Sequence, residues 1–171
     1  MFRLLPLAAA FCAAALSALA QGADVSFGGL RQDTSEPVEI AADRLEIDQD
    51  SGAATFSGNV VIGQGEMRLT GARVDVTYST GEAGEIERLH ATGGVTFLSG
   101  EEAAEAREAI YTIADGALVM TGDVLLTQGR NTIAGDRLSV DLEAGTGVME
   151  GRVRVLFDAE NGGADAEGGQ P

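Results

Sequence analysis

The chain has 171 residues, with 24 glycines, 3 prolines, no tryptophan and a formal net charge of −16 from 27 acidic and 11 basic residues. So few cations exclude binding to nucleic acid, because they could not neutralise a phosphate backbone. The length allows one domain with a core, and the many Gly, Val, Ile, Thr and Leu residues favour short strands and tight turns over helices.

Residues 1–20 are typical of a secretory signal peptide. Arg3 gives a positive start, residues 4–19 form an apolar run, and residues 18–20 have the small-x-small pattern of a cleavage site. We therefore expect an exported protein whose mature chain begins near Gln21.

Two other interpretations of this segment remain open. A retained membrane anchor would need about 20 apolar helical residues, and the apolar run is short for that. A lipid attached to Cys12, the single cysteine, is disfavoured because the bulky Phe11 precedes it. Lipoprotein signals usually have a small residue at that position. Without this segment the mature protein has no cysteine and needs no disulfide in an oxidising compartment.

A repeat organises the rest of the chain. Each unit opens with a glycine that is followed by alternating apolar residues, at Gly58, Gly93, Gly122 and Gly151. A second small residue follows thirteen positions later in each full unit, at Gly71, Ala106 and Gly135, and Ala42 is a further one ahead of the first unit. This period of 29 residues, with one insertion around residues 80–84, predicts stacked units that cannot bury an apolar face alone.

The chain divides into a leader, a folded region and a tail. Residues 21–36 are Gly-rich and polar without a period, so we expect a flexible leader, and residues 158–171 have no apolar anchor and should be disordered. Between them, the fold over residues 37–157 is expected to contain strands over 38–47, 56–62, 67–78, 86–90, 95–98, 118–126, 133–142 and 148–157.

One stretch conflicts with the repeat. Residues 101–107 are strong helix formers and in isolation would be read as a helical turn. The repeat places them where residues 65–72 lie in the first unit, so we expect a strand from about Ala106, with a helix as the open alternative.

Strands with one apolar face must pack so that these faces meet, which predicts an all-β, elongated roll of two antiparallel sheets around an apolar interior. Such a roll has two open ends, where the first and last strands have unpaired backbone edges. An exported protein can use such edges to form chains by strand addition. The edge residues are Val38, Ile40, Leu45, Arg152, Val153 and Val155.

Several segments together resemble the OstA-like family. They are the opening PVEIAADRLEID, the runs GNVVI and GDVLL, and their partners GARVDVTY and GDRLSVDL, which cover residues 36–157 behind a signal peptide. The resemblance implies a twisted β-jellyroll of V-shaped cross-section and a periplasmic protein that bridges the inner-membrane lipopolysaccharide transporter and the outer-membrane translocon. The implied partners are the acyl chains of lipopolysaccharide, an LptC-like inner-membrane protein, an LptD-like outer-membrane protein and further copies of the chain, with no cofactor.

Burial of acyl chains would supply the binding energy. Each methylene gains about 0.8 kcal/mol on leaving water, so a chain of roughly a dozen carbons gains on the order of 10 kcal/mol. The same side chains would serve equally as a plain core, and this alternative stays open. The lipid-binding candidates are Phe56, Val60, Ile62, Met67, Leu69, Val76, Tyr78, Phe97, Tyr111, Met120, Leu126, Leu138, Val140 and Phe157.

Charged residues also recur in the repeat. Arg44, Arg73 and Arg137 stand two positions after a second small residue, with Glu108 at that place in the remaining unit. We expect an outward ladder of cross-strand charge pairs, with contact to lipid phosphates as the alternative. His90 has no second His or Cys to share a metal, so it is interpreted as structural.

No catalytic set is apparent, because no nucleophile has a plausible base partner when His90 is the only imidazole. Three alternatives remain beside the lipid carrier. They are an LptC-like membrane-anchored protein of the same fold, a scaffold that forms filaments without lipid, and a polysaccharide-active enzyme with a carboxylate pair. The enzyme is disfavoured because aromatic residues make up only 5% of the chain.

Overall fold

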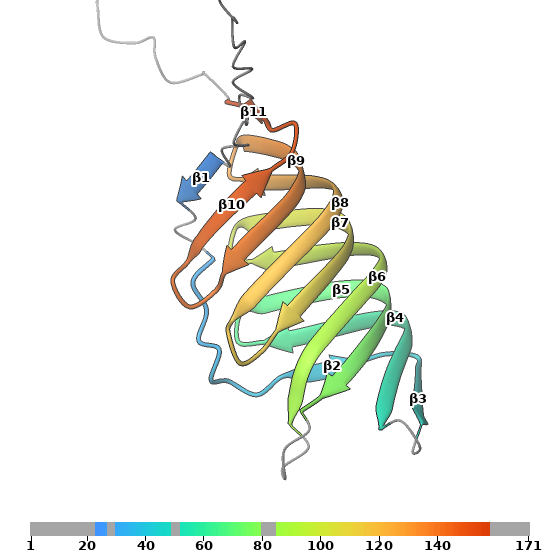
Figure 1. The fold of residues 1–171 in the computed structure, drawn as a ribbon. Coiled ribbons are helices and arrows are strands. Elements are labelled where there is room, and N and C mark those ends of the chain that lie inside the picture. The colour runs from blue at the N-terminus through green and yellow to red at the C-terminus, as the bar shows by residue number, and fades with distance from the viewer. Residues whose placement is uncertain (1–22, 27–29, 49–51, 80–84, 158–171) are drawn as a thin grey trace, which may run out of the picture.

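The fold is known from a computed structural model that describes residues 23–26, 30–48, 52–79 and 85–157. All regular elements in these ranges are strands of one eleven-stranded antiparallel sheet (Figure 1). The signal peptide and the acidic tail expected from the sequence lie outside the described residues. The strands are β1 (Ala23–Ser26), β2 (Glu39–Ala41), β3 (Arg44–Asp48), β4 (Ala53–Gln64), β5 (Met67–Tyr78), β6 (Ile86–Ser99), β7 (Glu102–Thr112), β8 (Ala117–Gln128), β9 (Asn131–Asp141), β10 (Thr146–Glu150) and β11 (Arg154–Leu156).

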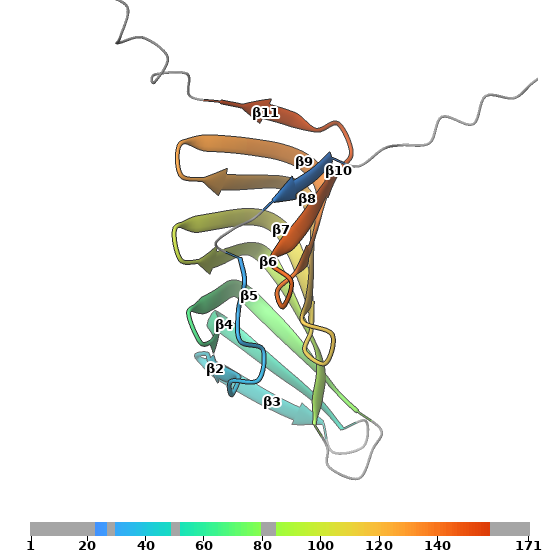
Figure 2. The same cartoon turned by 90° about the vertical axis from the view of Figure 1, so that its left-hand side faces the viewer.

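The sheet folds into two walls that meet at a corner. Each of the pairings from β4 to β9 is interrupted near its middle by a bulge, so that every long strand runs from one wall into the other. The walls diverge from the corner and leave the opposite side open (Figure 2). The all-β fold is confirmed, and so is the V-shaped cross-section that the resemblance implied. The two antiparallel sheets expected from the residues are instead the two walls of one continuous sheet, because the long strands cross from one wall to the other.

Each wall has its own end strands. Wall A consists of β2, residues 60–64, 67–71, 95–99, 102–106, 124–128 and 131–135, and β11. Wall B consists of β3, residues 53–57, 73–78, 86–92, 108–112, 117–121 and 137–141, β10 and β1.

The repeated small residues build the corner. Gly93 has a φ of +87°, in the left-handed region that side chains rarely adopt, and a Cβ added there would lie 2.6 Å from the Cβ of Ala72 on the neighbouring strand. The strands can therefore bend and approach closely only where the residue is small. The other first small residues of the repeat, Gly58, Gly122 and Gly151, also have positive φ.

The stretch rich in helix formers is a strand. β7 begins at Glu102, earlier than the start near Ala106 that the repeat predicted. Ala104 lies opposite Phe97 of β6 and Leu126 of β8 and is buried between the walls. Pairing on both sides thus outweighs the helix propensity of this segment.

Residues 23–26 and 30–36, the described parts of the segment that the sequence predicted to be a flexible leader, contact the roll. β1 pairs with β10 at the end of wall B, and Leu30 is fully buried within the apolar cluster. After Leu30 the chain runs along the open side of the V to β2 (Figure 2). No helix in the described ranges is long and apolar enough to cross a membrane.

Candidate functional site

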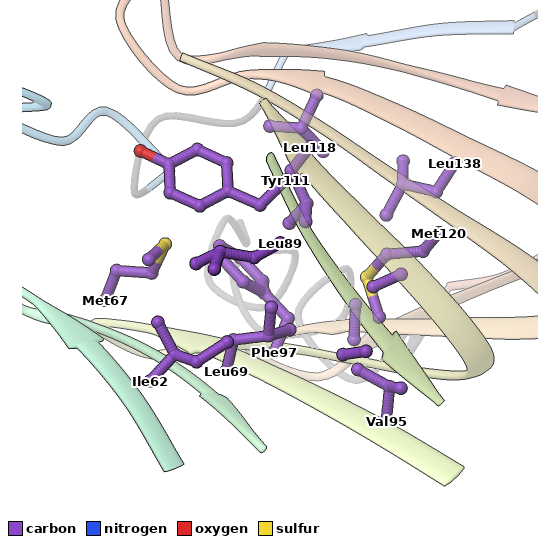
Figure 3. Packing of buried hydrophobic residues seen from close by; sticks show 14 of the residues in the cluster. Ile62, Met67, Leu69, Leu89, Val95, Phe97, Tyr111, Leu118, Met120 and Leu138 are labelled. Carbon is purple, nitrogen blue, oxygen red and sulfur yellow. The ribbon is translucent and has the colours of Figure 1, made fainter. Parts of the chain in front are cut away.

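The space between the walls is filled by apolar side chains. Alternate residues of each strand point inward, so both walls contribute to one continuous cluster. Met67, Ile62, Leu69 and Phe97 of wall A face Leu89, Tyr111 and Leu118 of wall B (Figure 3). The cluster extends through all the layers of the roll from β4 to β10.

Most of the candidates named from the sequence lie in this cluster. Phe56 is partly buried against it, and the fully inward ones are Val60, Ile62, Met67, Leu69, Val76, Phe97, Tyr111, Met120, Leu126, Leu138 and Val140. Contact of any of them with lipid remains a prediction.

Tyr78 and Phe157 do not share this burial, and their expected inward position is wrong. Tyr78 is 36% exposed, because the register with β6 shifts between Thr77 and Tyr78 at the end of the strand. Phe157 is 72% exposed, because it follows β11, the end strand of wall A, which no further layer covers.

Other inward residues were not named as lipid candidates. Leu89, Leu118 and Met149 are fully buried, and the apolar alternation of their strands is a signal that could have identified them. Leu30 is equally buried, but it lies in a leader without a period, so no sequence pattern marks it.

A hydrogen bond joins the two walls at the open side. The Tyr111 hydroxyl of wall B donates to Gln64 Oε1 of wall A at 2.5 Å, and both side chains are buried. Burial, with a smaller contribution from the negative charge of Glu143, raises the pKa of Tyr111 to about 12. The bond ties the end of β4 to β7 across the mouth of the V.

Residues 30–36 lie across this mouth, and we call them the strap. The Gln32 backbone N–H donates at 2.8 Å to the carbonyl oxygen of Leu142, which directly follows the wall B half of β9, and Gln32 Nε2 donates to Ser99 Oγ of wall A at 2.7 Å. Further along, Gln64 Nε2 donates to the carbonyl oxygens of Thr34 and Glu36, each at 2.8 Å. The strap is therefore held by both walls.

The outer faces carry the expected charge ladder with one difference. The arginines face outward and form ion pairs, but two of them bond along their own strand, because positions two apart lie on the same face. Only the third pair crosses strands as predicted. The pairs are Arg44–Glu46 at 2.6 Å, Arg73–Asp75 at 2.7 Å and Arg137–Glu150 at 3.6 Å.

Glu108 takes the fourth place in the ladder. It accepts one hydrogen bond from the Thr121 hydroxyl and contacts His90 Nε2 at 3.2 Å. These two interactions lower the pKa of its carboxyl group, and the bond from Thr121 has the larger effect. His90 thus pairs with a neighbouring strand. Within the described residues, no group of three or more His, Cys, Asp or Glu side chains could hold a metal ion.

The ends of the roll differ from each other. At the first end, no described strand pairs with the outer edge of β2 or β3, and Leu45 is 49% exposed. At the other end, β11 has a free outer edge with Val155 exposed, but β1 pairs with the outer edge of β10. The two open rims expected from the sequence are thus present except at β10, which a segment of the same chain covers.

The remaining predicted edge residues lie beside these strands. Val38 and Ile40 are partly buried against the core at the first end, and Val153 is partly buried at the other. Arg152 pairs with Asp136 at 2.5 Å, and its guanidinium lowers the pKa of that carboxyl group.

The chain is similar in sequence to known proteins. Residues 39–146 match the family described as LptA/(LptD N-terminal domain) LPS transport protein. An uncharacterized protein of Rhizobium meliloti strain 1021 is 29% identical over 157 residues, covering 86% of this chain and 84% of that protein. The lipopolysaccharide export system protein LptA of Escherichia coli K12 is 30% identical over 113 residues, covering 63% of this chain and 60% of that protein.

A solved structure has the same fold. It is the crystal structure of LptH, the LptA-homologous periplasmic component of the lipopolysaccharide transport device of Pseudomonas aeruginosa. The two superpose with a TM-score of 0.65 at 20% sequence identity, covering 74% of this chain and 98% of the LptH chain.

Proposed function

The chain belongs to the family of LptA/(LptD N-terminal domain) LPS transport proteins, and we propose that it holds the acyl chains of lipopolysaccharide between wall A and wall B. In this function it passes lipopolysaccharide across the periplasm, from an inner-membrane transporter to the outer-membrane translocon. Its contacts at the two ends are an LptC-like and an LptD-like protein, with further copies of the chain between them. The function requires no catalytic step.

The continuous apolar cluster between the walls is the observation that carries this proposal. An acyl chain placed there leaves water completely, and a chain of roughly a dozen carbons gains on the order of 10 kcal/mol. The phosphorylated sugars stay at the mouth, where polar groups such as Gln64 and Ser99 lie. Acidic residues outnumber basic ones by 27 to 11, which favours binding through acyl chains over binding through phosphates.

The buried state of the cluster sets a condition on binding. Leu69, Leu118 and Met120 are fully buried, so the interior is packed, as protein cores are. A lipid can enter only if the walls part or if a removable segment leaves. The strap is such a segment, because it contributes Leu30 to the cluster and is tied to the walls by hydrogen bonds.

A photocrosslinking experiment tests the function. A photoreactive residue at Leu138, which points inward from β9, should capture lipopolysaccharide in cells. The same residue at Thr77, which is exposed on the outer face of wall B, is the matched control and should capture none. Capture at Thr77 without capture at Leu138 would refute the assignment of the interior as the lipid site. Export is tested separately by fractionation and by an N-terminal sequence beginning at Gln21.

A further inference from the structure

The strands at the two ends of the roll follow the repeat. β3 and β2 flank Ala42 as the halves of β5 flank Gly71, and β10 and β11 flank Gly151 as the halves of β4 flank Gly58. If a second copy followed β10 and β11, its β3 and β2 would lie beside them, as the two halves of β5 lie beside β4. The pairing of β4 with β5 supplies the register for such a contact.

This register can be counted residue by residue. Phe56 pairs with Val74, Thr55 with Asp75 and Ala54 with Val76. In the repeat, Gly151 corresponds to Gly58, and Ala42 of a second copy corresponds to Gly71. Counting from these equivalent positions gives the residues of the second copy that would lie opposite β10. The resulting pairs are Met149 with Leu45, Val148 with Glu46 and Gly147 with Ile47 of the second copy.

β1 already occupies this register. Ala23 pairs with Met149, Asp24 with Val148 and Val25 with Gly147. Residues 23–25 of the same chain thus stand at the places that residues 45–47 of a second copy would take. The residue types agree as well, since Ala-Asp-Val repeats the order of Leu-Glu-Ile, with an acidic residue between two apolar ones.

We propose that β1 is an intramolecular cap that imitates β3 of a second copy, and that growth at this end requires the exchange of β1 for the partner's β3. The inference rests on the end-to-end assembly in the proposed function. While β1 is bound, only the β11 edge of wall A is open at this end. The apparent affinity between copies is then reduced by the fraction of chains that are uncapped.

The second copy has the advantages needed for this exchange. Its β3 has five residues against four in β1, so it can form a longer ladder of backbone hydrogen bonds with β10. Its β2 would pair with β11 in the same step, which the cap does not do. The cap is in turn retained by the strap, whose Leu30 lies within the cluster.

Engineered disulfides test the register in cis and in trans, with Cys12→Ser in every variant. The double variant Asp24→Cys/Val148→Cys should form an intramolecular disulfide on oxidation, and it should then remain monomeric in light scattering until it is reduced. An oxidised mixture of a Glu46→Cys variant and a Val148→Cys variant should give crosslinked dimers. Thr77→Cys in place of Glu46→Cys is the control and should give none. Assembly of the oxidised double variant equal to that of the reduced one would overturn the proposal.

Weakening the cap gives the opposite effect. Proline at both positions in Asp24→Pro/Val25→Pro removes backbone donors from β1. Assembly should then occur at about tenfold lower protein concentration, which corresponds to roughly 1.4 kcal/mol of capping. If the protein concentration at half-maximal assembly is unchanged, the proposal that β1 is a cap is wrong, although end-to-end assembly itself is not contradicted.

A separate pair of variants tests assembly itself. Val155→Asp places a charge on the open β11 edge and should prevent assembly, whereas Leu125→Asp, at a similarly exposed apolar residue within wall A, should not. If the parent chain does not assemble at any concentration, or if Val155→Asp has no effect, the end-to-end assembly in the proposed function fails and the cap fails with it.

Discussion

The hydroxyl of Tyr111 in wall B and the side-chain amide of Gln64 in wall A form a buried 2.5 Å hydrogen bond across the mouth of the V. Gln64 uses its other amide atom to hold the strap, through the carbonyl oxygens of Thr34 and Glu36. One side chain therefore connects both walls and the segment that closes them. Substitutions at Tyr111 or Gln64 should therefore weaken both the contact between the walls and the attachment of the strap.

Replacing Tyr111 by Phe should destabilise the protein. The substitution keeps the ring but leaves Gln64 Oε1 buried without the hydroxyl donor, which costs about 1–3 kcal/mol. The measurement is the free energy of unfolding from urea denaturation. Tyr78→Phe is the control, because Tyr78 is partly exposed and its change should stay within about 0.5 kcal/mol. Equal effects of the two substitutions would contradict the role of this bond.

The same tyrosine should make stability fall in alkali. Its folded-state pKa of about 12 lies above the usual value near 10, so the folded protein binds more protons than the unfolded chain between these values. The stabilisation is complete below about pH 10 and is lost as the pH rises through about 12, by on the order of 2 kcal/mol. Lysines do not obscure this window, because every basic residue of the chain is arginine. Tyr111→Phe should flatten the pH profile, and an equally steep profile in that variant would contradict the assignment.

The sequence predicted those parts of the fold that depend on local periodicity. Apolar alternation placed residues such as Ile62 and Leu138 inward. The spacing of small residues predicted the repeat but not the corner that these residues build, which only the bulges of the paired strands reveal. The start of β7 was predicted too late, because pairing with two neighbouring strands, which sequence does not display, determines it. The packed strap was missed for a related reason. Leu30 is buried by residues far along the chain, and nothing around it alternates.

The corner yields a prediction at two adjacent glycines. An alanine at Gly93 would place its Cβ 2.6 Å from the Cβ of Ala72, in a conformation with a φ of +87°. Gly94 has a φ of +84°, but an added Cβ would meet no atom within 4 Å. Gly94→Ala should therefore cost about 1–2 kcal/mol for its backbone conformation, and Gly93→Ala should cost about 1–3 kcal/mol more for the clash.

Thermal or urea unfolding of the two variants measures this difference. Because the residues are neighbours with the same backbone preference, their comparison separates the clash from the conformational cost. If both variants lose the same stability, close approach at the corner is not what requires the small residue at position 93.

The strap gives the last prediction, which concerns lipid and stability together. Leu30→Ala removes a fully buried side chain, so the lipid-free protein should lose about 2–5 kcal/mol of stability. If acyl chains displace the strap, the same variant should bind lipopolysaccharide several-fold more tightly, because less free energy is needed to release the strap. Calorimetric unfolding and a lipopolysaccharide binding titration on the full chain give the two values.

Leu118→Ala is the matched control for this change. Leu118 is also a fully buried leucine, but it lies on β8 within wall B and cannot leave the interior. Its replacement should lower stability by a similar amount and should weaken lipid binding, because it removes apolar contact from the site itself. Opposite changes in lipid affinity would identify the strap as a competitor of the lipid. Weaker binding in both variants would mean that the strap is part of the binding site and stays in place when lipid binds.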